Sequence, residues 1–190
     1  MGNAGRVIGR CSMAIIGMLL ASVVAAAAPD DIARLNKEAK ALLRSDPQRA
    51  QQIAQQALQL AQARTDPAGE AGARINLGSI ERQRGRYDQA VVEFERAVAL
   101  TDDAKAQLPY ADALTQLGVT LDMSGLHAEA LEAESKALAI YEGQQDAARI
   151  SAALINLGNA LSNLGDDVRA GEHYRRALAV KRSNGITRGV

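Results

Sequence analysis

The 190-residue chain has one cysteine, no tryptophan, one phenylalanine and four tyrosines. So few bulky aromatic residues exclude most β-sandwiches and barrels, whose strands depend on aromatic and β-branched side chains. Basic and acidic residues number 22 each, so there is no excess positive charge to attract nucleic acid. Alanine, by contrast, is abundant, with 38 copies. We therefore expect an all-α protein whose helices pack at close range, with no nucleic-acid partner.

The sequence also lacks the usual catalytic and metal-binding patterns. His127, in a short predicted turn, and His173, in a predicted helix, have no ligand at the i, i+4 spacing of a helical metal pair. There is no glycine-rich phosphate loop and no nucleophile elbow. Gly165-Asp166-Asp167 lacks the alternating oxygen ligands of a calcium loop and fits the start of a helix better. We expect a protein that is not an enzyme and has no cofactor and no metal site.

The N-terminus has the features of an export signal. Arg6 and Arg10 precede an uncharged run, residues 12–28, that ends in small residues. Ala25 and Ala27 fill the small-residue positions of a cleavage site, so we expect residues 1–27 to be removed in the bacterial envelope and the rest to be periplasmic or secreted. The alternative is an uncleaved membrane anchor, because the apolar run has about the minimum length of a spanning helix. Any membrane contact is expected through this segment alone.

A unit of 40 residues repeats along the rest of the chain. Leu-Gly pairs occur at 77–78, 117–118 and 157–158. Alanines follow each pair at fixed distances: Ala90, Ala130 and Ala170, then Ala97, Ala137 and Ala177. A degenerate first copy begins near Ile32. We place the units near 31–66, 67–106, 107–146 and 147–183, within a repeat domain of residues 28–183. A tail, 184–190, follows and could begin a further repeat.

Each unit is predicted to form two helices. Apolar residues recur three and four positions apart in both halves of the unit. Gly85, Gly125 and Gly165 fit the C-terminal caps of the first helices. Asp46-Pro47 and Asp166-Asp167 fit the N-termini of second helices. Thr65-Asp66-Pro67 and Leu108-Pro109 are expected in the gaps between units.

This pattern resembles the tetratricopeptide repeat family, whose signature is Leu-Gly in the first helix and Ala-x3-aromatic-x2-Ala in the second. Residues 77–97 and 157–177 match it. HEAT repeats share a period near 40 but not this spacing. The usual tetratricopeptide period is shorter, and lengthened repeats are similar to those of kinesin light chains and bacterial signalling proteins. The resemblance implies a right-handed α-solenoid of about four antiparallel helix pairs. The extra residues are expected in longer helices or turns after the last alanine.

Small residues are expected to bring the two helices of a unit together. Gly78 and Ala90 allow close approach, and Phe94 or Tyr174 fills the remaining gap. Glu81 and Glu134 depart from the pattern, since each replaces a large packing residue. We interpret both as side chains whose stems pack while their carboxylates reach water. A functional carboxylate is the alternative.

The resemblance further implies that the first helices line a concave binding groove. The column before each Leu-Gly pair contains only carboxamides, which can both donate to and accept from a peptide backbone. The alternative is that these amides bond the neighbouring helix. The predicted groove residues are Asn36, Asn76, Ser79, Arg82, Gln116, Asp122, Asn156, Asn159 and Asn163.

We expect an exported, non-catalytic module that binds a protein or peptide. The columns where chaperone-binding members carry a lysine and arginine clamp hold Asp112, Thr115, Ala152 and Ile155, which argues against a chaperone-tail receptor. The alternative function is the N-terminal input region of a bacterial signalling protein, such as a diguanylate cyclase or histidine kinase. A third is an envelope assembly scaffold.

The C-terminal unit has no capping helix after it in the sequence. Repeat arrays normally end in a cap with a polar outer face. We therefore expect either a longer reading frame or end-to-end self-association through the last helix pair. The apolar residues of this pair are Leu154, Leu157, Leu161, Leu164, Tyr174 and Leu178.

Overall fold

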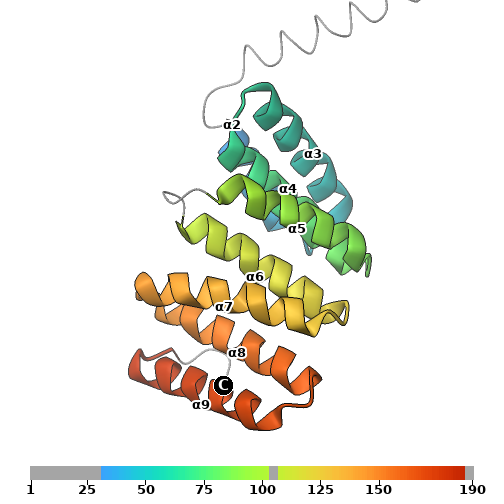
Figure 1. Cartoon of the computed structure of the whole chain (residues 1–190). Coiled ribbons are helices and arrows are strands. Elements are labelled where there is room, and N and C mark those ends of the chain that lie inside the picture. The colour runs from blue at the N-terminus through green and yellow to red at the C-terminus, as the bar shows by residue number, and fades with distance from the viewer. Residues whose placement is uncertain (1–30, 103–106, 187–190) are drawn as a thin grey trace, which may run out of the picture.

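The computed structural model describes residues 31–102 and 107–186, which form eight α-helices and no strand. The helices pair in chain order, as Figure 1 shows. They are α2 (Asp31–Leu42), α3 (Pro47–Ala63), α4 (Pro67–Gln83), α5 (Tyr87–Thr101), α6 (Gln107–Met123), α7 (His127–Gly143), α8 (Ala147–Asn163) and α9 (Asp167–Ser183). The predicted all-α solenoid of four helix pairs is confirmed.

The pairs stack in a single row. Each helix packs mainly on its neighbours in the chain, and α2 also contacts α4, α4 contacts α6, and α6 contacts α8. The row therefore runs from α2 and α3 at one end to α9 at the other (Figure 1). The first helices of successive units touch one another, so they form the inner row of the stack and the second helices lie outside them.

The ends of the helices follow local sequence signals. Gly85, Gly125 and Gly165 have φ of +73°, +86° and +81°, a left-handed conformation that glycine adopts without strain. Asp46 and Asp166 accept hydrogen bonds from the backbone N–H groups three residues on, so the predicted helix caps are confirmed. Asp66 and Asp146 cap α4 and α8 in the same way.

Two predicted turns are wrong. Leu108-Pro109 belongs to the first turn of α6, which begins at Gln107. Proline is tolerated there because the first backbone N–H groups of a helix have no partner inside it. His127 is the first residue of α7 and does not lie in the preceding turn.

The long period is accommodated by long helices. In the last two units both helices have 17 residues, and α7 continues past Ala137 to Gly143 before a three-residue connection leads to α8. The extra residues therefore lengthen the second helix, which was one of the two expectations.

Glycine allows the two helices of a unit to pack closely. A methyl group added at Gly78 would lie 2.9 Å from the ring of Phe94, and one at Gly158 would collide with Tyr174. This confirms the predicted contact in the second and fourth units. In the third unit Glu134 takes the aromatic position and packs on Gly118.

The predicted signal segment, residues 1–27, and the last four residues of the predicted tail lie outside the described residues. Among the helices that the structure describes, none combines the length and apolar character needed to span a membrane.

Candidate partner-binding groove

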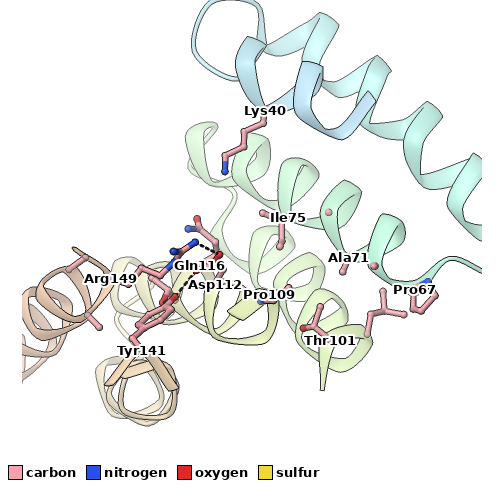
Figure 2. Close-up of a pocket in the computed structure, with 16 residues that line it drawn as sticks. Lys40, Pro67, Ala71, Ile75, Thr101, Pro109, Asp112, Gln116, Tyr141 and Arg149 are labelled. Atoms are coloured by element: carbon pink, nitrogen blue, oxygen red, sulfur yellow. Dashed lines mark hydrogen bonds and ion pairs between the residues drawn. The ribbon is translucent and has the colours of Figure 1, made fainter. Parts of the chain in front are cut away.

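The candidate site is a large cavity of about 600 Å³ on the inner row of helices. Figure 2 shows that its walls come from α4, α6 and α8, with contributions from α2, α5 and α7. One side is apolar and is formed by Ala71, Ile75, Leu100, Pro109 and Ala153. The polar lining consists of Lys40, Thr101, Asp112, Thr115, Gln116, Tyr141 and Arg149.

A network of charged and polar groups joins α6, α7 and α8 at this cavity. The Nε and Nη2 atoms of Arg149 donate to the two carboxylate oxygens of Asp112, at 2.8 and 3.0 Å. The Tyr141 hydroxyl donates to Asp112 Oδ1 at 2.9 Å and lies 3.0 Å from the Thr115 hydroxyl. Arg149 also donates from Nη1 to Asp146 at 2.6 Å. A two-pronged arginine–carboxylate pair is well oriented, so these groups form a fixed polar wall.

The charges in this wall are largely compensated. The hydrogen bonds that Arg149 donates to Asp112 and Asp146 raise the pKa of Arg149, so its guanidinium stays charged. The N–H groups of Arg149 lower the pKa of Asp146, and burial raises the pKa of Tyr141, so its hydroxyl stays protonated. Lys40 points from α2 toward the cavity (Figure 2). With one arginine between two carboxylates and a lysine nearby, the cavity carries little net charge.

The four predicted carboxamides all hydrogen-bond within the protein. Asn36 Nδ2 donates to the carbonyl of Gly69 at 2.8 Å, and Asn76 Nδ2 donates to the carbonyl of Asn36 at 3.0 Å. Asn76 is only 3% exposed. Gln116 Oε1 accepts from Arg82 at 2.8 Å, and Asn156 Nδ2 donates to Glu134 at 2.9 Å. These bonds join neighbouring helices, which is the alternative that the sequence left open; of the four, Gln116 also lines the large cavity.

Of the remaining predicted groove residues, two lie on α4 and help to pack it, and three form hydrogen bonds near the C-terminal end of the groove. Ser79 is buried and donates to the carbonyl of Ile75 in its own helix, and Arg82 packs over the Phe94 ring while reaching α6. The other three lie in the C-terminal half of the groove and are joined by hydrogen bonds to partners on neighbouring elements. They are Asp122, Asn159 and Asn163.

Three polar residues that line the large cavity were not predicted from the sequence, namely Lys40, Tyr141 and Arg149. Their residue types do not recur at the equivalent positions of the other units, such as Ile80, Thr101 and Pro109, whereas the prediction compared columns that are alike in every unit. The sequence did contain a signal for the Asp112–Arg149 pair. The two residues are 37 positions apart, which is the 40-residue period minus about one helical turn. Opposite charges at that offset face each other on adjacent first helices.

The prediction for Glu134 is wrong. Its carboxylate does not reach water, since the residue is only 1% exposed. Burial, together with the nearby Asp122 carboxylate, raises the pKa of Glu134 to about 8, and the hydrogen bond from Asn156 opposes this only in part. Gly118 carries no Cβ atom, which leaves a space that the carboxyl group enters in place of an aromatic ring.

No cluster of three or more His, Cys, Asp or Glu residues that could hold a metal ion occurs in the described part of the chain. Asp122 and His127 lie within hydrogen-bond distance, with His127 Nδ1 2.7 Å from Asp122 Oδ1. The third member of this group is Asn163, which donates to the same carboxylate. The arrangement links α6 to α7 and α8.

A single row of stacked helix pairs, with the first helix of each pair on the inner face, defines a helical-repeat solenoid. Two sequence models described as tetratricopeptide repeats match the chain, one at residues 69–143 and the other at 153–186. The chain belongs to the tetratricopeptide repeat family, whose members generally mediate protein–protein interactions. The comparison with curated proteins finds no significant match.

Solved structures share the fold at low sequence identity. BtubC from P. vanneervenii is 21% identical with a TM-score of 0.72, covering 84% of this chain and 66% of its own. Aspartyl phosphate phosphatase F from Bacillus subtilis is 14% identical with a TM-score of 0.74, covering 84% of this chain and 43% of its own. The kinesin light chain TPR-like repeats from Podospora anserina are 18% identical with a TM-score of 0.61, covering 90% and 87%. These likenesses concern the fold alone.

Proposed function

We propose that this protein is an exported interaction module that holds an extended segment of a partner protein along its inner face. The observation that carries the proposal is the cavity of about 600 Å³ at the meeting of α4, α6 and α8. Its apolar side suits apolar side chains of the partner. Its fixed polar wall of Asp112, Tyr141 and Arg149 offers hydrogen bonds to the partner's backbone.

The network at the cavity also supports binding because it is already formed in the free protein. Arg149 and Asp112 hold each other by two hydrogen bonds, so little side-chain freedom is lost when a partner arrives. Thr115 and Gln116 lie beside this pair on the same face of α6. One helix, α6, therefore contributes three adjacent hydrogen-bonding side chains to the cavity.

Ala152 allows the proposal to be tested without disturbing the core. It lines the cavity and is exposed, so Ala152→Tyr fills the site from α8. Ala139→Tyr is the matched control, because Ala139 is exposed on α7 and does not line the cavity. Tagged wild type and both variants are used to capture proteins from bacterial envelope extract, with quantification by mass spectrometry.

We expect a partner that wild type and Ala139→Tyr retain and that Ala152→Tyr loses at least tenfold. Circular dichroism of both variants should match wild type. Equal capture by all three proteins, with both variants folded, would show that the cavity is not the binding site.

Export is tested separately. The charged start, the uncharged run and the final alanines of residues 1–28 support cleavage after residue 27. The protein is purified from fractionated bacterial cells and its intact mass is measured. We expect the envelope fraction to contain a chain that begins at Ala28. A full-length mass in that fraction would support the anchor instead, and a chain confined to the cytoplasmic fraction would overturn export.

A further inference from the structure

A second, smaller cavity lies farther along the same inner face. It has a volume of about 160 Å³ and lies between the C-terminal half of α6, α7 and α8. Its polar lining is made of four oxygen-bearing side chains, Asp122, Glu134, Asn156 and Asn159, and none of its lining residues is a lysine or arginine. The half-exposed side chain of Met123 also lines it.

One carboxyl oxygen in this cavity has no hydrogen-bond partner. Asn156 Nδ2 donates to Glu134 Oε1 at 2.9 Å, whereas Glu134 Oε2 is buried and bonds no group of the described residues. Buried polar atoms without a partner are rare in folded proteins. An atom of this kind, on a side chain that is 1% exposed and lines a cavity, indicates that the cavity receives a hydrogen-bonding group.

We propose that this acidic pocket binds the basic side chain, lysine or arginine, of the partner segment. An ammonium or guanidinium group brings only donors, which is what the carboxyl and carboxamide oxygens of the lining require. Asp122 provides a second carboxylate, which is also hydrogen-bonded to His127 and Asn163. The inference rests on the proposed function, because it concerns the same partner segment on the same face.

Binding of a cation is expected to release a proton. The facing groups on α6 and α8 are Asp122, Asn156 and Asn159. Among the residues that line this pocket in the described structure, the charge next to Glu134 is therefore negative and favours its neutral form. When the cation enters, the Glu134 proton leaves to solvent and the carboxylate pairs with the ligand. Since burial holds the pKa of Glu134 at about 8, affinity should rise with pH up to that value.

The test uses two small probes on the protein as it is purified from bacterial cells. Nα-acetyl-lysine-N-methylamide carries the ammonium group, and the norleucine derivative has the same apolar stem without it. Binding is followed by NMR of the Glu carboxyl carbons and the Asn side-chain amides. The variant is Glu134→Gln, which has nearly the same shape but no charge. Glu129→Gln, at an exposed position of α7 outside the pocket, is the control.

For wild type and Glu129→Gln we expect the lysine probe to shift the Glu134 and Asn156 signals saturably. Affinity should be about tenfold higher near pH 9 than near pH 7, because one proton is released per ligand. The norleucine probe should bind at least tenfold more weakly. Glu134→Gln should lose the preference for lysine and its pH dependence.

Several results would overturn the inference. They are equal binding of the two probes, retention of lysine binding by folded Glu134→Gln, and saturable shifts of the same signals by calcium ions with none by lysine. The outcome is independent of the capture experiment with Ala152→Tyr. If that variant loses the partner while the lysine probe fails to bind, partner binding in the large cavity is supported and cation binding in the acidic pocket is contradicted. The reverse result would contradict the groove and leave a lysine-binding pocket.

Discussion

Glu134 shows what a single departure from the repeat pattern does to a core position. Phe94 fills the equivalent position of the second unit completely and packs on Gly78. In the third unit a carboxyl group occupies that position, loses its water and leaves a cavity beside it. The residue therefore lowers the stability of the unit to which it belongs.

Glu134→Phe is expected to stabilise the protein by about 2 kcal/mol, because an aromatic ring replaces a buried group that lacks a partner. The free energy of unfolding is measured by urea denaturation at neutral pH. Phe94→Glu is the reciprocal change and should destabilise by more than that. If Glu134→Phe is no more stable than wild type, the space beside Gly118 does not fit a ring.

Glu134 should also make stability depend on pH. Its pKa is about 8 when folded and near 4.5 when unfolded, so between these values the folded protein holds one more proton. The free energy of unfolding therefore falls as pH rises through this window and levels off above it, with the full contribution present below about pH 4.5. Between about pH 5 and pH 7 the loss should be roughly 2 kcal/mol.

Glu134→Gln should remove this part of the pH dependence, since its amide does not titrate. Urea denaturation of wild type and variant at matched pH values gives the difference. Parallel curves for the two proteins across the window would mean that Glu134 is ionised in the folded state at neutral pH.

At the scale of the helix, the aspartate caps allow a test of how much the residue before a helix stabilises its N-terminus. Asp66 Oδ1 accepts from the backbone N–H of Gly69 at 2.9 Å at the start of α4. Asp66→Ala should cost about 1 kcal/mol of unfolding free energy, because that N–H loses its partner. Asp88→Ala is the control, since Asp88 is exposed in the first turn of α5, where no side chain caps the helix. Thermal melting followed by circular dichroism measures both; an equal effect would contradict the capping role.

The helices and their ends could be predicted because their signals are local. An aspartate before a helix, a glycine after it and apolar residues every three or four positions act within a few residues. The four-pair solenoid followed from the 40-residue period. Pro109 was misplaced because a proline fits both a connection and a first helical turn.

The candidate site could be predicted only in part. The recurring amides and the inner row of helices followed from the repeat. Arg149 and Tyr141 did not, because neither residue type recurs at its position in other units, and Arg149 acts through a contact between units. The burial of Glu134 was missed because a long side chain at a packing position usually extends to water, and only the cavity beside Gly118 allows it to stay inside.

At the scale of the whole molecule, we still predict that copies of the protein associate through the last helix pair, α8 and α9. Val168 is 74% exposed, Leu164 is 50% exposed and Tyr174 is 38% exposed, and all three belong to the last pair of helices. Exposed apolar groups gathered at one end favour contact between copies.

Sedimentation velocity over a range of concentrations should therefore detect dimers of the wild type. Val168→Glu should weaken them at least tenfold, whereas Val92→Glu, at an exposed position of α5, should not. A wild type that stays monomeric at all concentrations, or an equal effect of the two substitutions, would contradict association through this end.

The row of helix pairs also determines how the inner face is shaped. Among the described helices, substantial contacts are made only with the next helix and the next first helix, so no contact between distant units closes the row. Its curvature is therefore the sum of small rotations at successive interfaces. A change of packing between α3 and α4 therefore rotates all the following units together, and the displacement grows with distance from that interface. The width of the groove between α4 and α8 can thus be altered by side chains that no partner touches.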